Sequence, residues 1–422
     1  MKAYLILEDG HIFSGTSIGA KKEVVSEIVF NTSMTGYLEI LTDPSYAGQA
    51  VVMTYPLIGN YGVCPADMES LQPWSDAFIV RELSRVQSNF RSEEGIDAFL
   101  KKNGIPGIAG IDTRALTKIL RESGTMNGMI TTTEYHKEEL EKICSRIKEY
   151  RVKGVVSKVS CKEKYTMKVE DFCPTDYEKA RMSYMADKKM RAAIENAENA
   201  GVCTGEIAMY SVQGTAGVEK LNAVAANKEK ARKHYRIAMI DFGTKNNMQH
   251  CLQKHGCEVT VYPENTKAEE ILAGGYDGIM LSNGPGDPAE CVDIIEEVKK
   301  LYNSDTPIFA ICLGHQLMAL ANGFKTTKMK YGHRGANHPV KDLKTGRVYL
   351  SSQNHGYVVV EDSIDPEIAK VSFINANDKS VEGLSYKNKK IFTVQFHPEA
   401  CSGPQDTEFL FDEFIRMMEE DA

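Results

Sequence analysis

The 422-residue sequence has no pair of cysteines at C-x-x-C spacing, although it contains ten cysteines. Scattered cysteines provide neither a disulfide framework nor a zinc site, and they suit a reducing cytoplasm. No apolar stretch approaches the roughly 20 residues that are needed to span a bilayer. The sequence therefore predicts a cytoplasmic protein that has no metal site and does not associate with a membrane.

Blocks of basic charge are also missing, because 50 Lys and Arg residues stand against 58 Asp and Glu residues, for a net charge of −8. Nucleic-acid-binding proteins usually carry a basic patch, so we expect no nucleic-acid partner. The first ten residues alternate like a strand and soon reach Glu8 and Asp9, which argues against a signal peptide. A phosphate-binding G-x-x-x-x-G-K-[ST] loop is absent, so we expect no nucleotide site in this chain.

The remaining pattern predicts an α/β protein with two domains and a linker. Residues 1–150 mix short strands and turns with helical patterns, which is typical of a mixed α/β domain. In residues 236–422, apolar strands alternate with helical stretches, which predicts a mostly parallel sheet flanked by helices. These strands are expected at 237–241, 259–262, 278–282 and 307–311.

Residues 151–235 are predicted to be a linker that carries a helical surface insertion near 174–233. Apolar residues recur there at roughly helical spacing, namely Met182, Met185, Met190, Ala193 and Ile194. Nothing in this segment indicates a function.

Cys312 lies between the apolar run 306–311 and a helical pattern, and it is predicted to be a nucleophile on a strand-to-helix turn. The positive end of the helix is expected to lower the thiol pKa from its usual value of about 8.5. Gly314 would let the helix start approach a neighbouring strand, as in G-x-S-x-G turns. A cysteine in an apolar setting is, however, often only a small buried hydrophobe.

A base and an orienting group occur later in the sequence. The apolar run from Thr393 ends in His397 and Glu399, whose two-residue spacing puts both side chains on the same side of a strand. Pro398 then ends the strand. Cys312, His397 and Glu399 together are typical of a nucleophile, base and orienter triad.

These motifs resemble those of the class I glutamine amidotransferases. The likeness rests on Ala310–Gln316, on His397–Glu399 and on the glycine-rich turn Leu281–Pro288, with Ala310 a mild departure from the glycine of the family. The resemblance implies catalysis by the triad and an oxyanion hole made by the backbone N–H groups of Gly284 and Leu313. Such donors stabilise tetrahedral intermediates by roughly 3 to 4 kcal/mol each.

The rest of the chain narrows the resemblance to small, glutamine-hydrolysing subunits of carbamoyl phosphate synthetase. The segments that carry it are Phe30–Tyr37, Leu41–Tyr46, Thr54–Gly62, Gly110–Thr117, Tyr331–Val340 and Ser352–Tyr357. This family implies a glutaminase without a cofactor of its own, which supplies ammonia to a large synthetase subunit. By resemblance, that partner uses ATP, magnesium and bicarbonate to make carbamoyl phosphate for pyrimidine and arginine synthesis.

The resemblance also implies which residues contact the glutamine substrate. They are Ser45, Gly284, Gly286, Leu313, Gln316, Asn354, Gly356 and Tyr357, with Lys245 near the site. By residue type alone, Ser45 is an ordinary turn serine, Gln316 an exposed helix residue and Lys245 a solvated loop lysine. Four histidines are expected to be structural hydrogen-bonding groups because none has a second ligand at metal spacing: His315, His333, His338 and His355.

Two other function classes fit parts of the sequence. A thiol hydrolase or peptidase could use the same triad, but it gives no reason for the amino-terminal domain. A catalytically silent interaction subunit would not need Cys312, His397 and Glu399 together. Turnover of glutamine, rather than of peptides or folate conjugates, would separate these alternatives.

Overall fold

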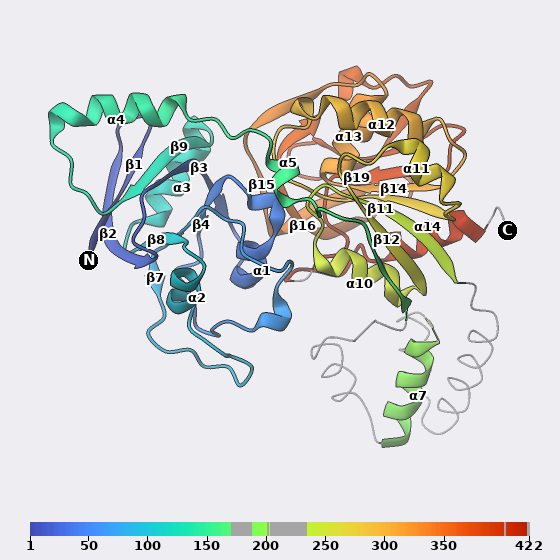
Figure 1. Cartoon of the computed structure of the whole chain (residues 1–422), viewed down its shortest axis with the longest axis horizontal. Coiled ribbons are helices and arrows are strands. Elements are labelled where there is room, and N and C mark those ends of the chain that lie inside the picture. Colours follow the sequence, from blue (N-terminus) through green and yellow to red (C-terminus); the bar gives the residue numbers. More distant parts are fainter. Residues whose placement is uncertain (170–187, 201, 203–233, 401, 420–422) are drawn as a thin grey trace.

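The amino-terminal domain is built on a closed barrel (Figure 1). The computed structural model describes residues 1–169, 188–200, 202, 234–400 and 402–419. The barrel strands run in the order β1-β2-β8-β6-β4-β3-β9. Their bounds are β1 (Lys2–Leu7), β2 (Ile12–Gly19), β3 (Val24–Asn31), β4 (Gln49–Met53), β6 (Ala77–Val80), β8 (Pro106–Ala109) and β9 (Met126–Thr131), and β5 (Leu57–Ile58) pairs separately with β7 (Glu82–Leu83).

Helices cover this barrel and complete its core. They are α1 (Tyr37–Thr42), α2 (Ile96–Lys102), α3 (Thr113–Ser123) and α4 (Lys137–Glu149). Helix α3 begins where the carboxylate of Asp112 accepts a hydrogen bond from the backbone N–H of Ala115 at 3.0 Å, as an N-cap does. Leu116 and Leu120 lie one helical turn apart and pack into the core beside strands β1, β3 and β4.

The segment after the barrel contributes to the second domain. Helix α5 (Val155–Val159) leads to β10 (Tyr165–Met167), which pairs antiparallel with β12 (Cys257–Pro263) of the second sheet. Helix α7 (Lys188–Asn199) contains Met190 and the buried Ala193 and Ile194 of the predicted insertion. Met182 and Met185 lie outside the described residues.

The carboxy-terminal domain contains a ten-stranded sheet in the order β10-β12-β11-β13-β14-β19-β18-β17-β15-β16. Its centre is parallel, and it consists of β11 (Tyr235–Asp241), β12 (Cys257–Pro263), β13 (Gly278–Leu281), β14 (Ile308–Ile311) and β19 (Ile391–Val394). An antiparallel extension, which strand and helix alternation did not predict, adds β15 (Thr326–Asp342), β16 (Val348–Val359), β17 (Ala369–Asn375) and β18 (Val381–Tyr386).

Helices cover both faces of the parallel centre (Figure 1). One face carries α11 (Ala268–Ala273), α12 (Val292–Tyr302) and α13 (Leu313–Ala321), and the other carries α10 (Asn246–Lys254) and α14 (Phe409–Glu419). Alternate residues of β11 serve the two cores, with Ile240 on the first face and Met239 on the second. Strands buried on both faces read as continuous apolar runs, which is why these were predictable. Among the described helices, none is long and apolar enough to cross a membrane.

Candidate active site

Cys312 occupies a strained turn between β14 and α13. Its backbone has φ 54° and ψ −104°, a conformation that residues other than glycine rarely adopt. The backbone N–H of Cys312 donates to the carbonyl of Val394 on β19 at 2.8 Å, which fixes the turn to the adjacent strand. Strain of this kind concentrates at functional sites, where the surrounding structure holds it in place. The thiol therefore has an imposed position at the carboxyl end of the parallel strands.

Gly314 seats helix α13 directly on the end of β13. Its N–H donates to the carbonyl of Ser282 at 3.1 Å, and a Cβ at this position would lie 2.5 Å from the carbonyl oxygen of Leu281. Backbone atoms on both sides leave no room for a methyl group. The close helix–strand approach expected from the sequence is therefore present.

We expect Gly314→Ala to destabilise the protein by roughly 1 to 3 kcal/mol, because the methyl group must displace the β13 backbone. The higher helix propensity of alanine partly offsets this loss of stability. The free energy of unfolding in urea would measure it. Gly95→Ala is the matched control, since Gly95 has φ −81° and its nearest neighbour is the flexible end of Gln87. An equal loss in both variants would contradict the packing argument.

His397, Glu399 and Lys245 form a buried chain of charge contacts beside the nucleophile. His397 Nδ1 lies 2.7 Å from Glu399 Oε1, and Lys245 Nζ lies 2.6 Å from the same oxygen. Burial raises the pKa of Glu399, but the charges of Lys245 and His397 outweigh it and lower that pKa to about 2. Lys245 is 7% exposed, so it is a buried counter-ion rather than a solvated loop lysine.

The thiol of Cys312 is neutral in this structure, and the expectation of a lowered pKa was wrong. Burial raises the pKa of Cys312 to about 12, and the carboxylates of Asp43 and Glu399 add to this effect. Lys245 and the N–H of Leu313 act in the opposite direction but are weaker. The sequence argument considered the helix terminus alone and omitted desolvation, which disfavours the charged form.

The neutral thiol makes a hydrogen bond with a backbone carbonyl. Cys312 Sγ donates to the backbone carbonyl of Asn354, with a separation of 3.8 Å. His397 Nε2 is buried and has no hydrogen-bond partner among the described residues. His397 Nε2 is therefore free to accept a proton.

We expect the free protein to react slowly with iodoacetamide at Cys312 near neutral pH, because only the thiolate attacks the reagent. The rate should rise about tenfold per pH unit from pH 7 to pH 9, since both values lie below the raised pKa. Mass spectrometry of the Cys312 peptide would measure the rate. A free cysteine peptide is the control, and a plateau at Cys312 below pH 8 would contradict the raised pKa.

A cavity of about 500 Å³ opens between the two domains above Cys312. Its lining includes eight residues singled out from the sequence, namely Ser45, Gly284, Gly286, Cys312, Gln316, Asn354, Gly356 and Tyr357. Leu313 adjoins Gly284, because a Cβ on Gly284 would lie 2.7 Å from Leu313 Cδ2. Gln316 is buried rather than exposed, and its amide donates to the carbonyl of Tyr357 at 2.9 Å. Concave sites of this size suit a small-molecule ligand.

Two amides bind the domains together at this cavity: Asn354, which the sequence analysis placed at the substrate, and Asn283, which it did not assign to the site. Asn283 Nδ2 donates to Ser45 Oγ and to the carbonyl of Gly243, each at 2.9 Å. Asn354 Nδ2 donates to Asp43 Oδ2 at 3.1 Å, and Asp43 Oδ1 accepts from the N–H of Ser45 at 2.8 Å. Asp43 and Asn283 lie within the segments Leu41–Tyr46 and Leu281–Pro288 that carried the family resemblance, and this position was the signal available for them.

Glu69 is a second missed residue from the amino-terminal domain. Its carboxylate accepts a hydrogen bond from the N–H of Asn247 at 3.2 Å, and the side chain of Asn247 donates to the backbone carbonyl of Glu399. Burial raises the pKa of Glu69 to about 7, although Lys245 partly offsets this. No local sequence pattern marks Glu69, because its role depends on contact between the domains.

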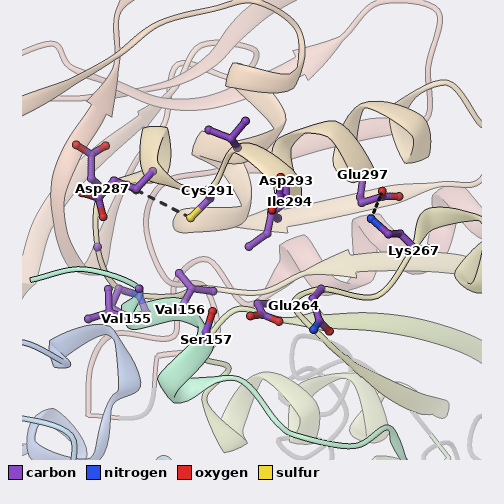
Figure 2. A pocket seen from close by; sticks show the side chains of 16 residues that line it. Val155, Val156, Ser157, Glu264, Lys267, Asp287, Cys291, Asp293, Ile294 and Glu297 are labelled. Atoms are coloured by element: carbon purple, nitrogen blue, oxygen red, sulfur yellow. Dashed lines mark hydrogen bonds and ion pairs between the residues drawn. The ribbon is translucent and has the colours of Figure 1, made fainter.

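A second cavity of about 330 Å³ lies on the other side of the glycine-rich turn, between α5 and the start of α12 (Figure 2). Cys291 points toward the carbonyl of Asp287 there, and Lys267 is paired with Glu297 at 3.0 Å. Gly286 and Asp287 line both cavities. The turn that approaches Cys312 is therefore also the wall between them.

Comparisons with known proteins agree in both domains. Residues 238–417 match the family model described as "Glutamine amidotransferase class-I", and residues 5–130 match "Carbamoyl-phosphate synthase small chain, CPSase domain". The chain is 43% identical to the carbamoyl phosphate synthase small chain of Listeria monocytogenes serotype 4b, covering 99% of this chain and 97% of the relative. It is 43% identical to that of Clostridium perfringens over 99% of both chains, and 42% identical to that of Bacillus caldolyticus over 100% and 97%.

Proposed function

Because the chain belongs to the family of carbamoyl phosphate synthase small chains, we propose that it hydrolyses glutamine and delivers the ammonia for carbamoyl phosphate synthesis. The observation that carries this proposal is the strained Cys312 at the base of a cavity beside the buried His397–Glu399 pair. A nucleophile, a base and an orienting carboxylate are the groups that acyl transfer requires.

The first half of the reaction forms a thioester. Glutamine enters the cavity with its carboxamide carbon over Cys312, and the thiol gives its proton to His397 Nε2. The sulfur then bonds to the carboxamide carbon and generates an oxyanion, which the N–H groups of Gly284 and Leu313 stabilise. Collapse of this intermediate breaks the C–N bond as His397 returns the proton to the leaving ammonia.

The second half hydrolyses the thioester. His397 takes a proton from water, the hydroxyl attacks the thioester carbon, and the C–S bond breaks as His397 returns the proton to the sulfur of Cys312, which releases glutamate. Glu399 holds the His397 ring through Nδ1 and stabilises its charged form. The low pKa of Glu399 supports this role, because the carboxylate stays ionised throughout.

The partner in this proposal is a large synthetase subunit that binds ATP, magnesium and bicarbonate. It receives the ammonia and makes carbamoyl phosphate in the cytoplasm, for pyrimidine and arginine synthesis. The absence of a G-x-x-x-x-G-K-[ST] motif from the sequence supports placing the nucleotide chemistry on another chain.

Glutamate release from glutamine tests this function, measured for the chain alone and with a large subunit, bicarbonate and ATP. We expect weak release from the chain alone and strong release in the complete mixture, with carbamoyl phosphate as product. A γ-glutamyl peptide serves as the alternative substrate. Preferential turnover of that peptide would favour a peptidase, and no release by folded, partner-bound protein would favour a silent subunit.

A further inference from the structure

Three buried side chains from separate strands bring their donor atoms together beside the cavity. His333 on β15, His355 on β16 and Glu382 on β18 each offer one ligand atom, and these atoms lie within 4.8 Å of one another. His333 and His355 are directly opposite in the β15–β16 pairing, so their side chains lie on the same face of the sheet. Their exposed fractions are 6% and 4%, and that of Glu382 is 0%. The three groups therefore meet away from bulk water.

Outer contacts orient both imidazole rings toward the centre of this cluster. His333 Nε2 lies 2.8 Å from Asp378 Oδ2, and His355 Nδ1 lies 2.8 Å from the backbone carbonyl of Tyr357. Each contact engages one ring nitrogen as a donor, so in the neutral rings His333 Nδ1 and His355 Nε2 present lone pairs to the interior. Metal-bound histidines characteristically have an outer carboxylate or carbonyl partner of this kind.

Several inner atoms are incompletely satisfied. His333 Nδ1 and Glu382 Oε2 are buried and make no hydrogen bond with any described residue, whereas Glu382 Oε1 accepts from Asn375 Nδ2 at 3.1 Å and lies 3.4 Å from His333 Nδ1. His355 Nε2 lies 3.1 Å from Gln353 Oε1. When the proton of the neutral His355 ring is on Nδ1, both of these atoms are hydrogen-bond acceptors and neither can donate to the other. Buried polar atoms without a partner are costly, and a cation between these atoms would satisfy all of them.

One pair of these atoms has the spacing of two ligands on a tetrahedral ion. Two ligands at about 2.0 to 2.1 Å from a tetrahedral metal are about 3.4 Å apart. His333 Nδ1 and Glu382 Oε1 are separated by 3.4 Å. Imidazole nitrogens combined with a carboxylate suit zinc and its transition-metal neighbours better than magnesium or calcium.

We propose that His333, His355 and Glu382 bind one zinc-like divalent ion, with Gln353 Oε1 as the fourth ligand. The site is structural, because four protein ligands close it to substrate. The ion would join β15, β16 and β18 next to Asn354, which lines the cavity. The sequence analysis predicted no metal site because these ligands are far apart along the chain and meet only through strand pairing.

Cobalt binding to the full chain tests this site, with Co²⁺ as the probe. A Cys312→Ser background removes the reactive thiol as a competing ligand. We expect one equivalent of Co²⁺ to give the intense visible absorption of four-coordinate cobalt, without a thiolate charge-transfer band. Glu382→Gln should weaken binding at least tenfold, and Asp378→Asn should weaken it about 10- to 100-fold through the outer contact. His136→Asn, at an exposed position, should leave binding unchanged.

Several results would overturn the proposal. One is the absence of the visible absorption from folded protein, and another is a thiolate band in its place. A third is Co²⁺ binding by the Glu382→Gln and Asp378→Asn variants that is as tight as binding by the Cys312→Ser background. In those cases Gln353 would adopt the opposite amide orientation and donate to His355 without a metal. Asp378 is in an exposed turn, so its variant keeps the test valid if Glu382→Gln fails to fold. Metal content of the protein as purified gives an independent measurement.

Discussion

Replacing Cys312 with serine is expected to abolish glutamine-dependent carbamoyl phosphate synthesis while leaving ammonia-dependent synthesis by the assembled complex intact. The substitution removes the sulfur that forms the thioester, and it changes neither the strained backbone nor the cavity lining. Loss of a covalent nucleophile typically lowers kcat by at least about 10³-fold. Parallel assays of the reconstituted complex with glutamine and with ammonium chloride would measure the two activities.

Two controls make this result specific to chemistry at the thiol. Glutamine binding to the Cys312→Ser variant, measured by calorimetry, should persist because the cavity residues are untouched. Cys291→Ser, in the neighbouring cavity, should retain both activities. Loss of the ammonia-dependent reaction in the Cys312→Ser complex would contradict the assigned division of labour.

Replacing Lys245 with methionine is expected to have the largest effect on stability. Its ammonium group is buried among Glu399, Glu69 and Asp43, so the variant leaves buried carboxylates without their counter-ion. Removing one partner from a buried ion pair typically costs about 3 to 5 kcal/mol of stability, and we expect a loss of about this size for Lys245→Met. Urea unfolding would measure the loss. Lys267→Met is the matched control, since the Lys267 side chain is 67% exposed and its pair is worth at most about 1 kcal/mol.

The same variant should change the pH dependence of glutamine hydrolysis. Lys245 lowers the pKa of Glu399, so its loss raises that pKa and protonates the carboxylate at a higher pH. The acidic limb of the kcat/KM profile should therefore move upward in pH. Adding Glu69→Gln should recover part of the stability lost in Lys245→Met, because it removes one uncompensated charge. An unshifted acidic limb would contradict the role assigned to Lys245.

The sequence was informative wherever local pattern controls structure. Apolar runs predicted the parallel strands, and the helical spacing after Cys312 predicted α13. His397 and Glu399 are in contact as predicted, but the predicted strand through both residues is wrong, because β19 ends at Val394 and Glu399 lies in a turn. The strands and the helix depend on neighbours along the chain, and their periodicity determines which side chains face the core.

Features that depend on distant neighbours were missed. The contacts of Asn283 with Ser45 and of Glu69 with Asn247 exist only because two domains meet. The thiol pKa was misjudged for the same reason, since Asp43 and burial oppose the helix terminus. The meeting of His333 with His355 depends on the register of two long antiparallel strands, which periodicity alone does not determine.

The Asp43–Ser45 turn has a consequence for how this chain can be divided or recombined. It supplies hydrogen-bond partners for Asn283 and Asn354, so a glutaminase domain produced alone would expose both amides to water and open one wall of its substrate cavity. A boundary drawn by sheet topology would therefore separate a catalytic unit that is continuous in space. In a chimera, a transferred carboxy-terminal domain should be accompanied by the Asp43–Ser45 turn of the same parent protein, because the domain and that turn form one unit.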